Sequence, residues 1–101
     1  MKVYRYEDRN HVGPFTHIGL NRRFAQLPTA QEEGLPHTAG YASACVNTQA
    51  LVHYFGINNC NVIEAKGYMM AEYEVEDVLT GDTQCVFRID RAVFNGFIDE
   101  E

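Results

Sequence analysis

Positive charge is scarce in this chain of 101 residues, which has 8 lysines and arginines against 14 aspartates and glutamates. Its formal net charge is −6. Nucleic acids and anionic membranes attract proteins through clustered lysines and arginines. The charge balance therefore argues against a protein that binds nucleic acid or a membrane surface. It is compatible with a small phosphorylated ligand held by one or two arginines.

Long hydrophobic runs are also missing. No apolar stretch approaches the roughly 18 residues that a membrane-spanning helix needs. The first twenty residues carry Arg5, Glu7, Asp8 and Arg9, where a secretory signal would need an apolar segment. We therefore expect a cytoplasmic protein.

Cysteine and histidine are too few and too widely spaced for a metal centre. Cys45, Cys60 and Cys85 are odd in number and form no CxxC pair. The histidines form no HxH or HExxH group. In a reducing compartment such cysteines remain thiols. The sequence thus predicts buried thiols, no disulfide framework and no metal.

The residues that are present fit a single α+β domain over 1–101. Hydrophobic residues make up 46% and charged residues 22% of the chain, both near the averages for globular proteins. The pattern reads strand, long loop, strand, helix, helix, strand, strand. We therefore predict a small, mainly antiparallel sheet with two short helices.

Strands are predicted where aromatic and β-branched residues alternate, and helices where capping residues flank apolar faces. The predicted strands are 2–7, 40–46, 68–75 and 83–89, and the last two form an antiparallel hairpin with one face on the core. One helix begins at Asn47 or Thr48 and stops at Gly56, and a second runs from Asn59 to Gly67. Residues 15–40 are mostly loop, with one or two helical turns over 20–27.

Three polar side chains are candidates for contact with a ligand. The guanidinium of Arg5, in mid-strand between two tyrosines, could hold a phosphate through two hydrogen bonds. Ser43 stands among small residues that leave space beside the backbone, and Gln84 could bond a ribose or an amide. Each has a structural alternative: an arginine paired with a surface acid, a serine needed for close packing, and a solvated glutamine.

Acidic residues cluster near the end of the third predicted strand. Glu72, Glu74 and Glu76 share one strand face, and Asp77 is beside them. A stripe of carboxylates repels itself and could bind a metal or imitate the phosphates of DNA. A solvated surface is the structural alternative.

Four stretches, taken in order, resemble a group of small phage and prophage proteins with an ADP-ribosyltransferase-like fold. They are VYRYE (3–7) with GPF (13–15), YASA…QAL…YF (41–55), GY…EYEV (67–75) and GDTQCVF (81–87). The resemblance implies an ADP-ribosyltransferase-like core that binds NAD or a similar nucleotide.

The same resemblance implies roles for particular residues. Arg5 on the first strand would contact NAD, and Ser43 on the second would support the nicotinamide ribose. Phe15 and Tyr41 would border the same pocket. Gln84 stands where a transferase has its catalytic glutamate, and an amide does not titrate. The implied protein is a reduced core with little or no transferase activity.

Three functions stay open from the sequence. The first is the nucleotide-binding core, and a pocket shared by Arg5, Ser43 and Gln84 would favour it. The second is an anti-CRISPR-like inhibitor or adaptor that binds a host defence protein in the host cytoplasm through exposed carboxylates, including those of 99–101. The third is a structural or assembly module without a ligand.

Overall fold

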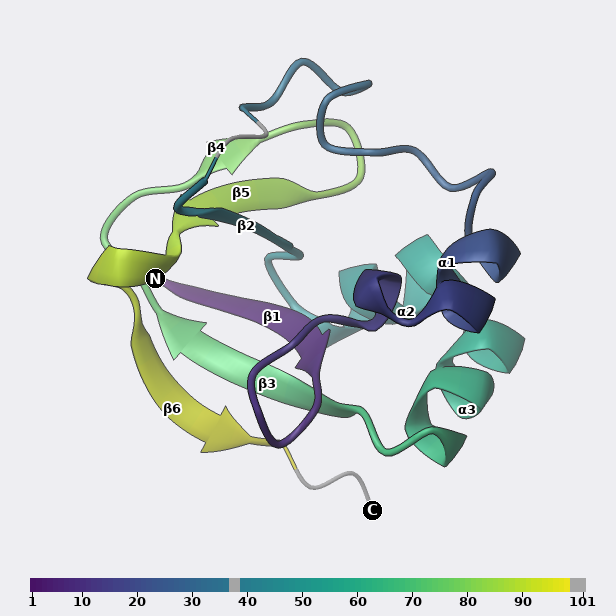
Figure 1. Ribbon diagram of the computed structural model, residues 1–101. Helices are drawn as coiled ribbons and strands as arrows, with labels where there is room; N and C mark the ends of the chain where they lie inside the picture. The colour runs from purple at the N-terminus through teal and green to yellow at the C-terminus, as the bar shows by residue number, and fades with distance from the viewer. Residues whose placement is uncertain (37–38, 99–101) are drawn as a thin grey trace.

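The computed structural model describes residues 1–36 and 39–98 and has a mixed α+β architecture (Figure 1). Its described part contains three α-helices, where the sequence predicted two. The elements in chain order are β1 (Lys2–Glu7), η1 (Pro14–Thr16), α1 (Ile18–Arg23), β2 (Tyr41–Ala44), α2 (Thr48–Phe55), α3 (Ile57–Ala65), β3 (Met69–Glu74), β4 (Leu79–Thr80), β5 (Cys85–Arg88), η2 (Ile89–Arg91) and β6 (Val93–Phe97).

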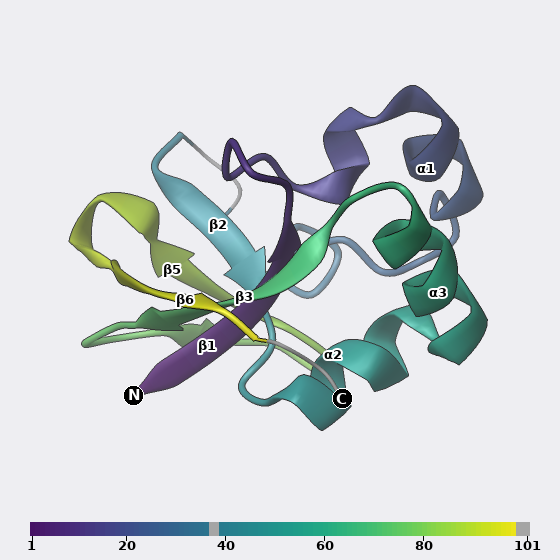
Figure 2. The same cartoon turned by 90° about the horizontal axis from the view of Figure 1, so that it is seen from below.

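The strands form two three-stranded antiparallel sheets rather than one, with the orders β1-β3-β6 and β2-β5-β4. The sheets are joined where Tyr4 of β1 faces Cys45, the residue after β2. Each of these two residues donates its backbone N–H to the carbonyl oxygen of the other, at 2.8 Å. We call this pair the sheet junction. The helices gather on one side of the strands in two perpendicular views (Figures 1 and 2).

The predicted hairpin between 68–75 and 83–89 is wrong. β3 pairs with β1 and β6, whereas β5 pairs with β2 and β4. Alternation along a strand shows which face is buried, but it does not identify the neighbouring strand. The turn after Thr80 does connect antiparallel strands, but these are β4 and β5, and Gly81 donates its N–H to the Gln84 carbonyl oxygen at 2.7 Å. β6 was not predicted, because its sequence VFNGF does not alternate between apolar and polar residues, and in the structure these residues are exposed or half-buried.

Helix α2 has the limits that the sequence predicted. The side-chain oxygen of Asn47 accepts a hydrogen bond from the Ala50 N–H at 2.7 Å and so caps the first turn. The helix stops at Gly56, whose φ of 86° lies in a region that favours glycine.

Helix α3 begins at Ile57, directly after Gly56, and not at the predicted Asn59. Asn59 lies inside the helix, where its Nδ2 donates to the Phe55 carbonyl oxygen at 2.7 Å. Its side-chain oxygen also accepts a hydrogen bond from Arg23 Nε at 2.7 Å, which ties α3 to the end of α1. Helix α1 in turn covers 18–23, earlier than the predicted turns over 20–27.

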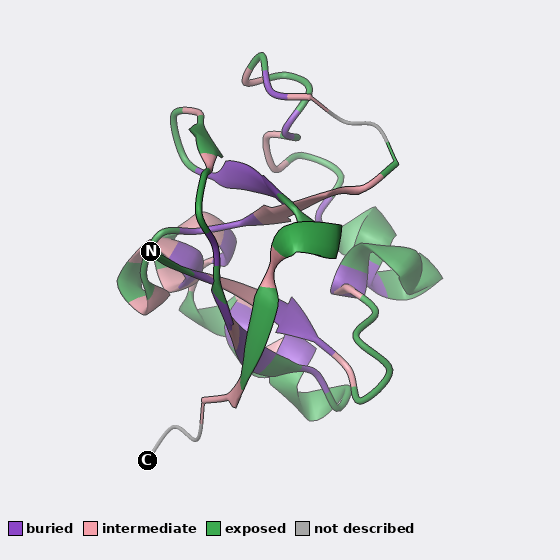
Figure 3. Cartoon of the chain, turned by 90° about the vertical axis from the view of Figure 1, so that its left-hand side faces the viewer, coloured by how far each residue is buried: buried purple, intermediate pink, exposed green. Residues whose placement is uncertain are grey.

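Two groups of buried side chains lie on opposite faces of the sheet β1-β3-β6. One group packs the helices against Tyr6 and Met70, and the other fills the space toward β2 and β5 with Val3, Tyr73 and Phe87. Figure 3 shows buried segments, in purple, along β1, β3 and β5, whereas β6 is exposed at the edge. β3 is therefore covered on both faces, although its sequence predicted a single core face.

The three cysteines are buried thiols, as predicted. Burial raises the pKa of Cys45 to about 12, with further contributions from Cys85 and Glu33. Burial also raises the pKa of Cys85 to about 11. Both thiols are therefore protonated at neutral pH and behave as packing groups.

We predict that Asn47→Ala lowers the free energy of unfolding by about 1 kcal/mol, because the Ala50 N–H loses its capping acceptor. Asn61→Ala is the matched control, since Asn61 is exposed within α3 and alanine favours a helix. Urea unfolding followed by circular dichroism gives both values. Equal stability of the two variants would contradict the capping role.

Candidate ligand-binding pocket

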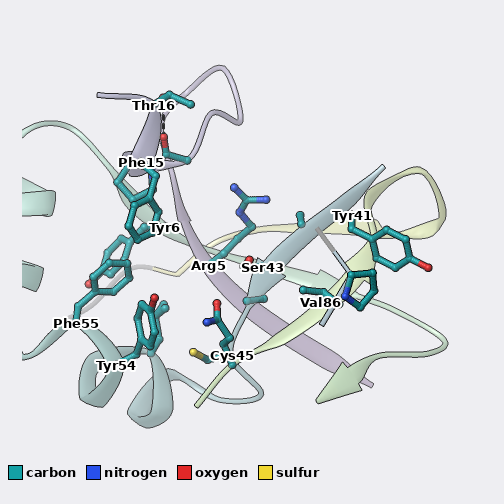
Figure 4. Close-up of a pocket in the computed structure, with 17 residues that line it drawn as sticks. Arg5, Tyr6, Phe15, Thr16, Tyr41, Ser43, Cys45, Tyr54, Phe55 and Val86 are labelled. Carbon is teal, nitrogen blue, oxygen red and sulfur yellow. Dashed lines mark hydrogen bonds between the residues drawn. The ribbon is translucent and has the colours of Figure 1, made fainter. Parts of the chain in front are cut away.

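A pocket of about 260 Å³ lies beside the sheet junction (Figure 4). Its walls come from β1, η1, β2, α2 and the start of β5. Small-molecule sites commonly begin at about 300 Å³. A pocket of this size would enclose part of a nucleotide, with the rest of the ligand lying outside it.

All five residues that the sequence analysis selected line this pocket: Arg5, Phe15, Tyr41, Ser43 and Gln84. They come from β1, η1, β2 and the residue before β5. In the view of Figure 4, Arg5 and Ser43 stand between the aromatic side chains around Phe15 and the side chain of Tyr41. The structure thus brings the five together, and their contact with a nucleotide stays a prediction.

Arg5 carries the charge of the pocket, since no other described residue that lines it is charged at neutral pH. Its side chain is 19% exposed, and Nε lies 3.4 Å from Oε2 of the buried Glu7. Arg5 is therefore paired with a buried acid and not with a surface one. The Nη2 atom lies against Gly13, where an added Cβ would come within 2.6 Å of it, so a larger residue at this position would displace the guanidinium.

Gln84 is buried, 8% exposed, and is not the solvated residue of the structural alternative. Its Nε2 donates to the Pro28 carbonyl oxygen at 2.9 Å and to Oε2 of Glu33 at 3.0 Å. The amide thereby ties 28–36 to the start of β5. This segment also supplies Pro36 to the pocket wall.

Glu33 lies beside the site, in the segment 15–40 that the sequence predicted as mostly loop. Its carboxylate accepts hydrogen bonds from the Thr83 N–H at 2.8 Å, the Thr83 hydroxyl at 2.5 Å and the Gln84 N–H at 3.3 Å, in addition to Nε2 of Gln84. Burial alone would raise the pKa of Glu33, but these hydrogen bonds hold it below the ordinary value of 4.5.

One sequence signal could have indicated that this loop is ordered. Thr29 and Glu32 have the spacing of a capping box and bond reciprocally, since each backbone N–H donates to the side-chain oxygen of the other at 3.1 Å. The box fixes the turn immediately before Glu33.

Tyr54 of α2 contributes an uncharged side chain to the pocket lining. Tyr54 donates its hydroxyl to the Pro28 carbonyl oxygen at 2.5 Å. Burial, followed by the charge of Glu33, raises the pKa of Tyr54 to about 12. The hydroxyl therefore stays protonated at neutral pH and remains a donor.

The predicted acidic stripe is partly neutralised by local cations. Glu74 accepts a hydrogen bond from the Met1 amino group at 2.7 Å, and Glu72 lies 3.7 Å from Lys2 Nζ. Residues 99–101 lie outside the described residues. Within 1–36 and 39–98, no group of three or more His, Cys, Asp or Glu side chains is placed to hold a metal ion.

Fold and pocket together define a small α+β protein with a cationic, aromatic-walled pocket between two antiparallel sheets. A family model described as bacteriophage T4 Y00F protein matches residues 1–100, so the chain belongs to this family of phage proteins. The predicted relation to small phage proteins is confirmed. No curated protein and no solved structure matches the chain significantly. None of the helices in the described residues is long and apolar enough to cross a membrane.

We predict that Gln84→Glu lowers the free energy of unfolding by about 2 kcal/mol at pH 7. The variant would place a second carboxylate beside Glu33 and lose both donors of the amide. Glu33→Gln in the same chain should recover part of the loss, and a double-mutant cycle of urea unfolding measures this coupling. Gln49→Glu, at an exposed position of α2, is the control. Additive effects of the two substitutions would contradict the pairing of Glu33 with Gln84.

The lowered pKa of Glu33 also predicts how stability depends on pH. A carboxylate whose pKa is lowered by folding stabilises the native state above its unfolded pKa, and this contribution is lost as the pH falls through its folded pKa. Glu33→Gln should therefore cost about 1 kcal/mol at pH 7 and progressively less below pH 4.5. Glu76→Gln, in an exposed position, is the control. A cost that is the same at pH 7 and pH 3 would refute this role of Glu33.

Proposed function

We propose that this phage protein binds a phosphate-bearing nucleotide such as NAD or ADP-ribose in the pocket beside the sheet junction. The observation that carries the proposal is the convergence of Arg5, Phe15, Tyr41, Ser43 and Gln84 on one pocket. Arg5 is on the first strand, Ser43 on the second and Gln84 at the start of a later one. These are the positions that the resemblance to ADP-ribosyltransferase-like proteins implies for nucleotide contacts.

The chemistry of the lining residues suits such a ligand. The planar guanidinium of Arg5 can bind phosphate oxygens through two parallel hydrogen bonds. Aromatic side chains, among them Phe15 and Tyr54, offer surfaces on which a nicotinamide or adenine ring can pack. The Ser43 hydroxyl can donate to or accept from a ribose.

Binding is proposed with little or no ADP-ribosyl transfer. Cleavage at the nicotinamide ribose builds positive charge, which a nearby carboxylate stabilises. Gln84 is neutral, and its Nε2 already donates to Pro28 and Glu33. The Glu33 carboxylate lies behind Gln84 and is not among the residues that line the pocket.

The alternative, an acidic inhibitor of a host defence protein that acts by surface binding, would be favoured by exposed carboxylates in a contiguous stripe. Glu76 and Asp77 are exposed, but the other two acids of the predicted stripe that the structure describes, Glu72 and Glu74, have cationic partners. An assembly module without a ligand would have no need for a pocket with a charged arginine. The pocket therefore favours the nucleotide-binding function over both.

We predict that NAD, ADP-ribose or both raise the thermal unfolding midpoint of the protein by several degrees. A ligand at 100 times its Kd adds about 2.7 kcal/mol of stability, which is a large shift for a domain of this size. Arg5→Ala should abolish the shift, because it removes the cation of the pocket. Arg22→Ala, at an exposed position of α1 away from the pocket, should respond like the wild type.

Incubation with labelled NAD completes the test by separating binding from catalysis. The proposal predicts a thermal shift without release of nicotinamide. A wild-type protein that none of these nucleotides stabilises, or an Arg5→Ala variant that they stabilise equally, would contradict nucleotide binding. Release that disappears in Arg5→Ala would instead show that the protein is an enzyme.

A further inference from the structure

A fully buried carboxylate lies beside the pocket. Glu7, the last residue of β1, is 0% exposed. It stands two residues after Arg5, so both side chains project from the same face of the strand. An ionised carboxylate is expensive to bury unless it is paired and hydrogen-bonded. The surroundings of Glu7 must therefore compensate its charge.

Three side chains hold Glu7 in one orientation. The Tyr73 hydroxyl on β3 lies 2.9 Å from Oε1 and 2.7 Å from Oε2. Nδ1 of His11, in the loop after β1, lies 3.0 Å from Oε1. Burial, followed by the hydrogen bond to Glu7, raises the pKa of Tyr73, so its hydroxyl remains a donor at neutral pH. Arg5 Nε approaches Oε2 from the third side, at 3.4 Å.

The guanidinium of Arg5 is confined at two points. Its Nε faces Glu7, and its Nη2 lies against Gly13, a residue of the pocket wall. Nε is buried, and no acceptor among the described residues meets it in hydrogen-bond geometry, so the attraction of Glu7 is electrostatic. Because Nε faces Glu7, the two Nη atoms are the part of this pocket-lining side chain that can grip an oxyanion through hydrogen bonds.

We propose that Glu7 is a positioning residue of the pocket, which holds the Arg5 guanidinium in place for the phosphate of the ligand. Glu7 does not touch the ligand and acts through Arg5, while Tyr73 and His11 hold Glu7 itself. The inference rests on the proposed nucleotide binding. Electrostatic repulsion alone would make the negative charge of Glu7 weaken the binding of an anionic ligand. A positioning role predicts the opposite, namely that removing this charge weakens binding.

The test is isothermal titration with ADP-ribose as the probe. Glu7→Gln should raise Kd about tenfold if positioning is lost, corresponding to about 1.4 kcal/mol. In an Arg5→Lys background, which lacks Nε and the guanidinium fork, Glu7→Gln should change Kd less than twofold. The control Glu76→Gln removes one exposed carboxylate and should leave Kd unchanged. A Glu7→Gln variant with unchanged or tighter binding would overturn the proposal, as would an equal loss in the Arg5→Lys background.

A second readout needs no ligand. The ¹⁵N relaxation of Arg5 Nε in the free protein should report a rigid side chain in the wild type and a mobile one in Glu7→Gln. Equal mobility would overturn the positioning role. If the wild type binds no ADP-ribose, the proposed function fails, but this comparison still decides the role of Glu7. Should Glu7→Gln not fold, Tyr73→Phe keeps the charge of Glu7 and removes one of its donors, and it should raise the mobility of Arg5 in the same way.

Discussion

Two backbone hydrogen bonds between Tyr4 and Cys45 join the two sheets, and the pocket depends on this junction. Arg5 follows one of these residues, and Ser43 precedes the other by two positions. Each sheet alone supplies only one wall. The register at the junction therefore decides that an arginine from β1 and a hydroxyl from β2 line the same pocket.

Two carboxylates lie beside the pocket, and each accepts hydrogen bonds from a residue far away in the chain, Glu7 from Tyr73 and Glu33 from Thr83. Glu7 is held by Tyr73 and Arg5, and Glu33 is held by Thr83 and Gln84. Neither lines the pocket. The protein has a net charge of −6, yet the charged residue that lines the pocket is a cation, Arg5, whose acidic partner Glu7 does not line it.

Local signals in the sequence were sufficient for β1, β2 and α2, since the cap at Asn47 and the stop at Gly56 act within a few residues. The order of the motifs also selected five residues that line one pocket. Strand partners could not be predicted, because alternation in β3 is the same whether it pairs with β1 or β5. The roles of Glu7 and Glu33 could likewise not be predicted, because each carboxylate is buried or held by a donor far away in the chain, Tyr73 at 66 positions from Glu7 and Thr83 at 50 positions from Glu33.

Nucleotide binding at the sheet junction is tested most directly by a two-dimensional ¹H–¹⁵N titration of the labelled protein with ADP-ribose. We expect the largest shift changes at backbone amides that border the pocket, in β1 near Arg5, in η1 at Phe15 and in β2 at Ser43. The side-chain amide of Gln84 should shift with them. Absence of saturable changes, or changes confined to α3 and β6, would contradict the account.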